Sequence, residues 1–418
     1  MTHRDRILSA LRHAPLDGIP WVPRLDLWYN AHRYRGTLPG EWRGASLMEI
    51  AADLGVGYHA VVPDFLDTEE PDEVYDRLLG IEHVRNQPYR VRFRRTERLI
   101  ERRGDEARVT YRTPVGSVSG KLRHDEAMRR DGITIMAVTE RVVKSAEDLE
   151  VIGFIFEDLE VKADESRYRG LCEEVGEAGL VVALGNVAAS PVHHLLKELV
   201  PYDWFYFELH DHPERIEGAA RRMEGYYEAV LEACAGSSAE AVLFGANYDL
   251  MLTPPSVFGP HILPTLARWA GRLHDGTASG LETRPTGGGE GSAGDARPTR
   301  GKLLLTHTDG ENEKLLDLYL QAGVDVADSV CPRPMTRLSL REYREAWGNR
   351  IAVWGGLCST CVLPNVFTEE QFEAHLDEAL EAAGDGRGLI FSLADTTPPE
   401  ASLERIRRIG ERIAERKP

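Results

Sequence analysis

Short apolar segments alternate with helical patterns through the last part of the chain, and this alternation limits the fold more than any other feature. Four segments read as buried strands: KLLLTHTDG (302–310), VDVADSV (324–330), IAVWGGL (351–357) and LIFSLAD (389–395). A helical pattern follows each of them. Because neighbouring parallel strands need a crossover connection that a helix can supply, this succession predicts a parallel sheet.

Earlier parts of the chain add further strand–helix units. LVVALGN (180–186) and AVLFGANYD (241–249) have the same buried-strand pattern, and GYHAVVPDF (57–65) reads as a strand that runs to Asp64. The total then approaches eight units, so we predict an α/β fold, a (β/α)8 TIM barrel with an N-terminal helical extension. An open doubly wound sheet is the alternative. The sequence has no GxGxxG motif after a strand and no Walker A loop, so nucleotide binding has no motif support.

Two segments are predicted to be additions to this core. Residues 82–121 are rich in β-branched residues and arginine, and RVTYRTPVGSVSGKLR alternates around Pro114 and Gly116, which predicts an appended antiparallel β-hairpin. Residues 275–301 are of low complexity and cannot bury enough apolar surface to order, so we predict a disordered surface insertion there. Residues 1–418 are therefore expected to form a single domain.

We expect deletion of residues 277–299 to leave activity unchanged, because the predicted insertion contributes nothing to the core. Comparing the turnover of the shortened chain with that of the full chain tests this. A large loss of activity with an unchanged thermal midpoint would show that the insertion has a functional role.

Composition excludes some classes of partner. Asp and Glu outnumber Lys and Arg by 68 to 50, a net charge of −18, which argues against non-specific binding of nucleic acid and against an anionic membrane surface. No apolar run approaches the roughly 20 residues of a membrane span. The charged helix predicted at the N-terminus lacks the apolar core of a signal peptide, so we expect a cytoplasmic protein.

The five cysteines are odd in number, and each is most simply a small buried side chain.

Polar side chains gather where the predicted strands stop, which is where parallel α/β folds carry their chemistry. These are Asp64, Asn186, Asn247, Tyr248, Asp249, His307, Asp309, Cys331, Cys358 and Asp395. One metal set is His307 with Asp309 and Asp395, which suits Zn, Mn or Fe and leaves positions open for substrate. Another is His307 with Cys358 and with Cys331 or Cys361, which would favour zinc. Without a metal, His307 reads as a buried histidine and Asp309 as the cap of the next helix.

Several segments, in their order and spacing, resemble one known family. They are RDRILSALRHAPLDGIPWVPR, TPVGSV, NYDLMLTPPSVFGPHILPTL, LTHTDGENEKLLDLYLQAGVDV, WGGLCS and LIFSLADTTPPEASLERI. Together they make the chain similar to the uroporphyrinogen decarboxylase superfamily, which includes the decarboxylase and the corrinoid:thiol methyltransferases. The resemblance covers most of the chain and implies a (β/α)8 barrel with its cleft at the carboxyl face.

The two branches of that family imply different site residues. The methyltransferases hold zinc with an H-x-C motif and a later cysteine; here His307 matches the histidine, while Asp309 and Asp395 stand at the two cysteine positions. In the decarboxylase branch, Arg24 would match a carboxylate-binding arginine and Asp64 the aspartate of the cleft floor. The tyrosine expected in SPVHHLLKEL is missing, and Asp395 stands at the late histidine.

The resemblance implies a barrel enzyme that transfers a methyl group between a small-molecule substrate and a corrinoid protein. One divalent metal, zinc being the first expectation, would be held by His307, Asp309 and Asp395. Tyr248 and Asp64 are candidate catalytic groups, Asp64 as a general base, and Arg24 would close over an anionic group. Asn186, Asn247 and Asp249 would bind substrate. The alternatives are a metal-free decarboxylase of the uroporphyrinogen type in tetrapyrrole metabolism, with Arg24 and Asp64 as its working residues, and a non-catalytic binding homologue. The sequence does not determine the oligomeric state.

Overall fold

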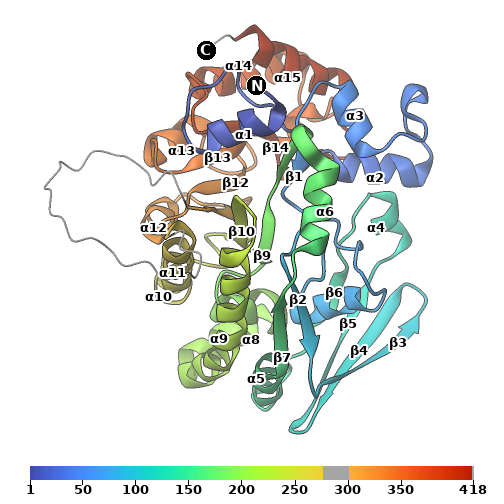
Figure 1. The fold of residues 1–418 in the computed structure, drawn as a ribbon, viewed down its shortest axis with the longest axis vertical. Helices are drawn as coiled ribbons and strands as arrows, with labels where there is room; N and C mark the ends of the chain where they lie inside the picture. The colour runs from blue at the N-terminus through green and yellow to red at the C-terminus, as the bar shows by residue number, and fades with distance from the viewer. Residues whose placement is uncertain (276–300, 417–418) are drawn as a thin grey trace, which may run out of the picture.

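A computed structural model describes residues 1–275 and 301–416 of the chain. Six strands form one parallel sheet in the order β14-β13-β12-β11-β10-β9. Their bounds are β9 Ala183–Asn186, β10 Ala241–Ala246, β11 Leu303–His307, β12 Val326–Val330, β13 Ala352–Cys358 and β14 Leu389–Ala394. The predicted α/β class with a parallel sheet is confirmed. Every residue of these strands is buried, because helices cover the sheet and leave neither face to water (Figure 1).

Backbone hydrogen bonds occupy both edges of this sheet. At β14, Val22 N donates to Phe391 O and Phe391 N donates to Pro20 O, each at 2.9 Å. At the other edge, β8 (Gly179–Val181) runs into β9 and pairs in parallel with β1 (Tyr58–Ala60). Gly57 N, just before β1, donates to Trp21 O at 2.9 Å. The segment around Trp21 therefore bridges β1 and β14.

Helices connect and cover the strands. Their bounds are α1 His3–Leu11, α2 Asp26–Arg35, η1 Gly40–Trp42, α3 Leu47–Asp53, η2 Glu73–Leu79, α4 Glu126–Arg130, α5 Asp148–Asp158, α6 Ser166–Val175, η3 Gly176–Ala178, α7 Pro191–His194, the π-helix η4 Leu195–Leu199, α8 Tyr202–Asp211, α9 Pro213–Gly236, α10 Pro255–His261, α11 Leu263–His274, α12 Leu316–Ala322, α13 Leu340–Trp347, η5 Ser359–Val362, α14 Glu369–Ala383 and α15 Leu403–Glu415. Ser46 and Glu49 form a capping box at the start of α3, so that two otherwise unpaired backbone N–H groups are satisfied. No helix among those described is both long and apolar enough to cross a membrane.

An antiparallel extension lies at the opposite end of the molecule from α14 and α15 (Figure 1). It contains a four-stranded sheet in the order β3-β4-β5-β6, with bounds β3 Glu97–Arg103, β4 Glu106–Thr113, β5 Gly116–Arg123 and β6 Ala137–Glu140. The hairpin predicted around Pro114 forms, with Thr113 opposite Gly116. A separate antiparallel pair joins β2 (Tyr89–Phe93) to β7 (Leu159–Ala163). The extension thus continues beyond the predicted 82–121. The insertion predicted at 275–301 falls almost wholly outside the described residues.

Aromatic stacking fixes helix α11 against the sheet. The rings of Trp269 on α11 and Phe244 on β10 are parallel, with centroids 3.6 Å apart, and both side chains are fully buried. Gly185 on β9 lies against the same indole, where a Cβ would come within 2.9 Å of a ring carbon. A glycine is required there because any larger side chain would push the indole off the sheet.

We expect Trp269→Ala to lower the free energy of unfolding by about 3–5 kcal/mol, because it leaves a cavity between α11 and β10. Phe207→Ala is the control, since that aromatic side chain on α8 is 70% exposed, and its effect should stay within about 0.5 kcal/mol. Urea unfolding of the three proteins measures both. Equal stabilities of the two variants would contradict the packing described here.

Candidate functional site

The end of β11 places His307 beside an aspartate of the neighbouring strand. The parallel register pairs His307 with Asp328 of β12. The His307 Nδ1 atom lies 2.6 Å from Asp328 Oδ2, and both side chains are buried. A carboxylate in this position accepts the Nδ1 proton, which fixes the ring and turns Nε2 towards the strand ends.

Two further carboxylates face His307 Nε2. Asp395 Oδ1 lies 3.3 Å from this nitrogen and Asp309 Oδ2 lies 3.9 Å from it. One ligand atom from each of the three residues lies within 4.8 Å of the other two. The structure therefore brings together the oxygen-rich metal set that the sequence suggested. Whether the set binds a metal stays a prediction.

Asp395 follows β14 directly and is surrounded by donors. Arg24 Nη1 donates to its Oδ1 at 2.7 Å, and Ser329 Oγ donates to the same oxygen at 3.2 Å. Burial by itself raises the pKa of Asp395, but the charges of Arg24 and His307 outweigh it and hold that pKa well below its usual range. Asp395 is thus an anion at neutral pH.

His307 is the partner that balances this charge. Burial lowers its pKa, but the hydrogen bonds to Asp328 and Asp395 prevail and raise the pKa of His307 well above its usual value. Without a metal the ring is therefore a cation held between two carboxylates. A metal would have to displace the Nε2 proton.

Asp309 lies in the turn after β11 and has the fewest partners of the three. Asn247 Nδ2 approaches both of its carboxylate oxygens at 3.4 Å. Asn247 is exposed and has a positive φ of 60°, which asparagine tolerates better than most residues. The Asn247 side chain thereby reaches from the end of β10 to the end of β11.

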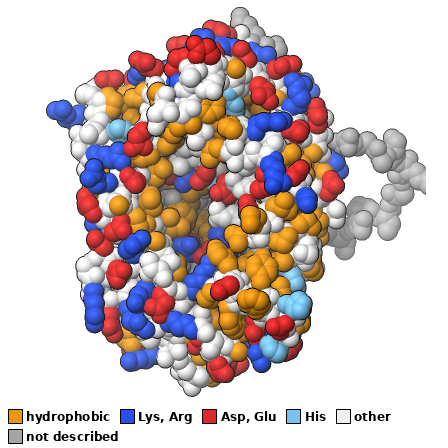
Figure 2. Space-filling model, turned by 180° about the vertical axis from the view of Figure 1, so that it is seen from behind, with side chains coloured by type: hydrophobic (Ala, Val, Ile, Leu, Met, Phe, Trp, Pro, Cys, Tyr) orange, Lys and Arg blue, Asp and Glu red, His pale blue; other side chains and the backbone are white. Residues whose placement is uncertain are grey.

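Two cavities are lined by residues that contact the His307, Asp309 and Asp395 set, one by Asn247 and the other by Arg24. The one we call the apolar cavity has a volume of about 430 Å³ and is reached from the set through Asn247. Its other lining residues include Ile133, Met136, Leu196 and Leu252, with Lys197 and Arg141. Figure 2 shows a hollow near the middle of one face, with hydrophobic side chains around it and charged groups inside. A cavity with these walls suits an apolar group that carries a few polar atoms.

The second cavity, which we call the polar cavity, has a volume of about 360 Å³ and is reached through Arg24. Asp64 lines it, and burial raises the pKa of that carboxyl group. His59 also lines it, and burial lowers the pKa of His59 to about 4. The shift brings Asp64 closer to neutral pH as a proton acceptor, whereas His59 is a neutral imidazole at that pH.

Three predicted site residues have structural contacts instead. Tyr248 is fully buried; its ring stacks on His193 with centroids 5.3 Å apart, and Thr306 Oγ1 donates to its hydroxyl at 2.9 Å. Asn186 is buried and its Oδ1 accepts from Ala188 N at 3.0 Å. Asp249 accepts from Met251 N and from Glu311 N, which shapes the loop after β10. None of the three lines the two cavities described above, and whether they bind substrate stays a prediction.

The structure does not group His307 with the cysteines of the alternative metal set. In the described part of the chain, no group of three close metal ligands combines His307 with a cysteine. Cys331 is buried, its Sγ lies 3.7 Å from Ala394 O, and burial raises the pKa of its thiol to about 12. Cys358 and Cys361 lie instead with His375, a residue that the sequence analysis did not single out.

Two functional candidates were missed from the sequence, Asp328 and His59. Asp328 interrupts the apolar strand VDVADSV, and a charged residue in a buried strand was a signal that could have been used. His59 lies within β1, where it packs edge-on against Trp354 with ring centroids 5.7 Å apart. Nothing in its sequence context distinguishes it from a core histidine.

Comparisons with known proteins give one informative result. No protein-family model matches the chain, and no curated protein matches it significantly. Among solved structures, the chain is similar to a methyltransferase from Methanosarcina mazei, with a TM-score of 0.52 and 16% sequence identity. The match covers 99% of this chain and 99% of that one. At this identity the likeness shows a shared fold over the whole length.

We expect Asp328→Asn to lower the pKa of His307, because the amide replaces a charged acceptor with a neutral one at the same position. A titration of the metal-free protein followed by imidazole NMR signals measures this. Asp64→Asn, which changes a carboxylate that does not contact His307, should leave the pKa unchanged. An unaltered His307 titration in Asp328→Asn would contradict the assignment of the hydrogen bond.

Proposed function

We propose that the chain is a (β/α)8 barrel enzyme that transfers a methyl group with the help of a divalent metal. Support for the barrel comes from the bridging hydrogen bonds: the segment around Trp21, β1, β8 with β9, and β10 to β14 make eight strand positions in a closed order. The full-length likeness to an archaeal methyltransferase supports the reaction class. The observation that carries the proposal is the convergence of His307, Asp309 and Asp395 at the strand ends.

The donor set is suited to a borderline or hard divalent cation. One imidazole nitrogen and two carboxylates leave positions open for substrate, as in catalytic rather than structural sites. Asp328 supports the set because it holds Nδ1 and leaves Nε2 for the metal, the usual partner arrangement for a ligating histidine. Asp395 uses Oδ1 for its present contacts, so its Oδ2 is the oxygen that is free to turn inward.

Bound there, a divalent cation supplies Lewis acidity to the heteroatom that gives or accepts the methyl group. The residues of the chain then orient that atom. Arg24 has five N–H groups and uses three of them on Asp26 and Asp395, which leaves two for an anionic group of the substrate. Asp64, across the polar cavity, can take the proton that an acceptor thiol or amine loses. Its raised pKa makes it a better base than an ordinary aspartate.

The apolar cavity would admit the other reactant from the opposite side of the set. A corrinoid carried by a partner protein is the methyl donor or acceptor that the family resemblance implies. The wall combines apolar side chains with charged ones, among them Lys197, Arg141 and Glu198, and would accept a large amphipathic group of this kind. The small substrate would then occupy the polar cavity, so that the methyl group moves across the metal set.

We expect His307→Ala, Asp309→Ala and Asp395→Ala each to lose one equivalent of bound zinc relative to the unmodified protein, because each removes one ligand of three. Elemental analysis of protein purified without chelator measures the loss. Asp64→Ala is the matched control, a carboxylate of the same cleft outside the set, and should keep the metal. Retention of all metal in the three variants would contradict the site.

Methyl transfer is tested separately from metal binding. With free methylcob(III)alamin as donor and a panel of thiols and amines as acceptors, transfer leaves cob(I)alamin, which is followed by its absorbance. We expect a rate that requires the metal and falls at least about a hundredfold in Asp309→Ala. Turnover that persists unchanged after chelation would rule out the metal-assisted mechanism.

One observation favours a second candidate, the metal-free decarboxylase. Arg24 and Asp64, the two residues that this reading needs, line the same polar cavity. Loss of carbon dioxide from a tetrapyrrole carboxylate by metal-free protein, abolished in Arg24→Ala, would select this candidate.

A further inference from the structure

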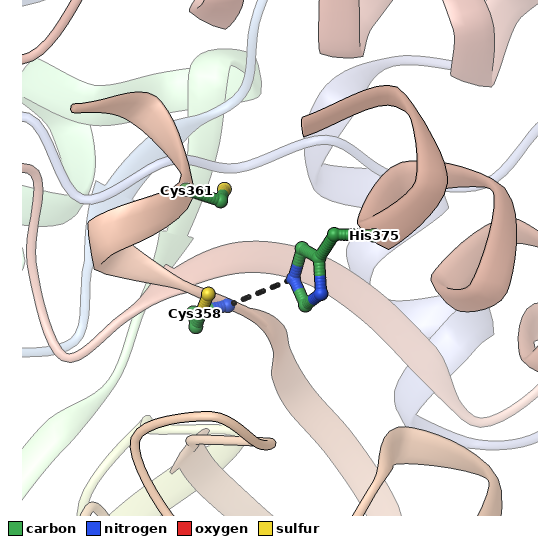
Figure 3. Close-up of side chains that lie close together, drawn as sticks. All are labelled: Cys358, Cys361 and His375. Atoms are coloured by element: carbon green, nitrogen blue, oxygen red, sulfur yellow. Dashed lines mark hydrogen bonds between the residues drawn. The ribbon is translucent and has the colours of Figure 1, made fainter. Parts of the chain in front are cut away.

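We propose that Cys358, Cys361 and His375 form a second metal site, a thiolate-rich structural site for zinc. The sequence places Cys361 three residues after Cys358, the last residue of β13, and inside the turn η5. His375 comes from the second turn of α14. Figure 3 shows the three side chains around one small space between these elements.

The distances are suited to a single ion. One ligand atom from each of the three residues lies within 4.8 Å of the other two. Around tetrahedral zinc, bonds of about 2.3 Å to sulfur and 2.0–2.1 Å to nitrogen put the ligand atoms roughly 3.5–3.8 Å apart. Small side-chain rotations towards a common centre close that difference.

The Nε2 atom of His375 faces Cys358. The backbone N–H of Cys358 donates to His375 Nε2 at 3.5 Å, so this nitrogen carries its lone pair towards the two cysteines (Figure 3). The ring also packs edge-on against Phe367, with centroids 5.9 Å apart, which limits its rotation. A metal at the centre would replace this long hydrogen bond with a coordination bond.

Burial points to a structural role. Cys358 and Cys361 are 0% and 1% exposed, and none of the three residues lines either cavity beside His307. A substrate therefore has no route to the ion through these cavities. Soft thiolates select zinc over the hard cations that carboxylates prefer, so this site and the His307 set would differ in the metals they take.

The site adjoins the proposed catalytic set through the sheet. Cys358 pairs with Ala394 in the parallel register, and Ala394 immediately precedes Asp395. A metal that ties the end of β13 to α14 would therefore stiffen the strand beside the one that carries Asp395. Arg405 already holds η5 through Cys361 O at 2.9 Å and contacts Glu369 at the start of α14, so the turn has a second anchor without metal.

Cobalt substitution in the full chain tests the proposal. Reduced, chelator-treated protein is titrated with Co²⁺ under anaerobic conditions, and the thiolate-to-cobalt charge-transfer band is recorded. We expect about one equivalent of Co²⁺ to produce the band and Zn²⁺ to abolish it. The wholly oxygen- and nitrogen-based His307 set cannot give this band, so Asp309→Ala should retain it.

Single-residue variants show which side chains bind the cobalt and which cysteines do not. Cys358→Ser should lose most of the band, and His375→Gln, which keeps both thiolates and a partly exposed position on α14, should weaken Co²⁺ affinity at least about tenfold. Cys172→Ser, a cysteine on α6 outside the group, should match the unmodified protein. No band in the unmodified protein, or a full band in Cys358→Ser, overturns the proposal.

A CxxC pair can also form a disulfide, and a count of free thiols tests for this alternative. The five cysteines are free thiols in the structure. A reagent that counts accessible thiols after denaturation should find five in protein purified with its zinc, because the metal keeps the pair reduced. A Cys358–Cys361 disulfide in such protein, with no cobalt band after reduction, would overturn the proposal in favour of a redox pair.

Discussion

Parallel hydrogen bonding between consecutive strands is the constraint on which the rest of the structure depends. From β9 to β14 each strand pairs with the next, so the carboxyl ends of all six lie along one edge. Residues far apart in the chain then become neighbours: Arg24 reaches Asp395 across 371 positions of sequence, and Asp328 reaches His307 across the β11–β12 register. The strands are buried along their whole length, and polar groups lie mainly at their ends and in the loops that follow. The same pairing places Cys358 beside the residue that precedes Asp395.

Charge balance is the second feature that organises the site. Asp328 and Asp395 flank His307, and Arg24 and Asp26 continue the chain of charges. An unpaired charge at these buried positions would be costly, so each of these groups has an opposite partner. A divalent cation could take the place of the proton on His307 Nε2, and its one additional positive charge would be offset by the surrounding carboxylates. This substitution is the physical basis of the function that we propose, and it explains how the set stays ordered when no ion is bound.

The two ligand groups differ in a way that bears on their roles. The set of His307, Asp309 and Asp395 contacts Asn247 and Arg24, each of which lines a cavity, whereas Cys358, Cys361 and His375 come from β13, η5 and α14. Each group supplies three ligands, so the two differ in access: the two cysteines are buried, whereas Asp309 and Asp395 are partly exposed. Two carboxylates at His307, Asp309 and Asp395 favour a harder metal than two thiolates would. The thiolates that this chain retains near the cleft are proposed to hold structure.

The sequence by itself determined the features that depend on local pattern. Strand–helix alternation indicated the parallel α/β class, Pro114 and Gly116 marked a hairpin, and His307, Asp309 and Asp395 could be located at strand ends. Only the tertiary structure decided which side chains meet. Asp328 was overlooked and the burial of Tyr248 was not foreseen, because the direction of a side chain at a strand end depends on register and on the turn that follows. The grouping of Cys358 and Cys361 with His375 also required the packing of α14 on β13. Contacts between elements that are distant in sequence leave no periodic trace in the chain, which is why a single sequence predicts the elements better than the site that they build.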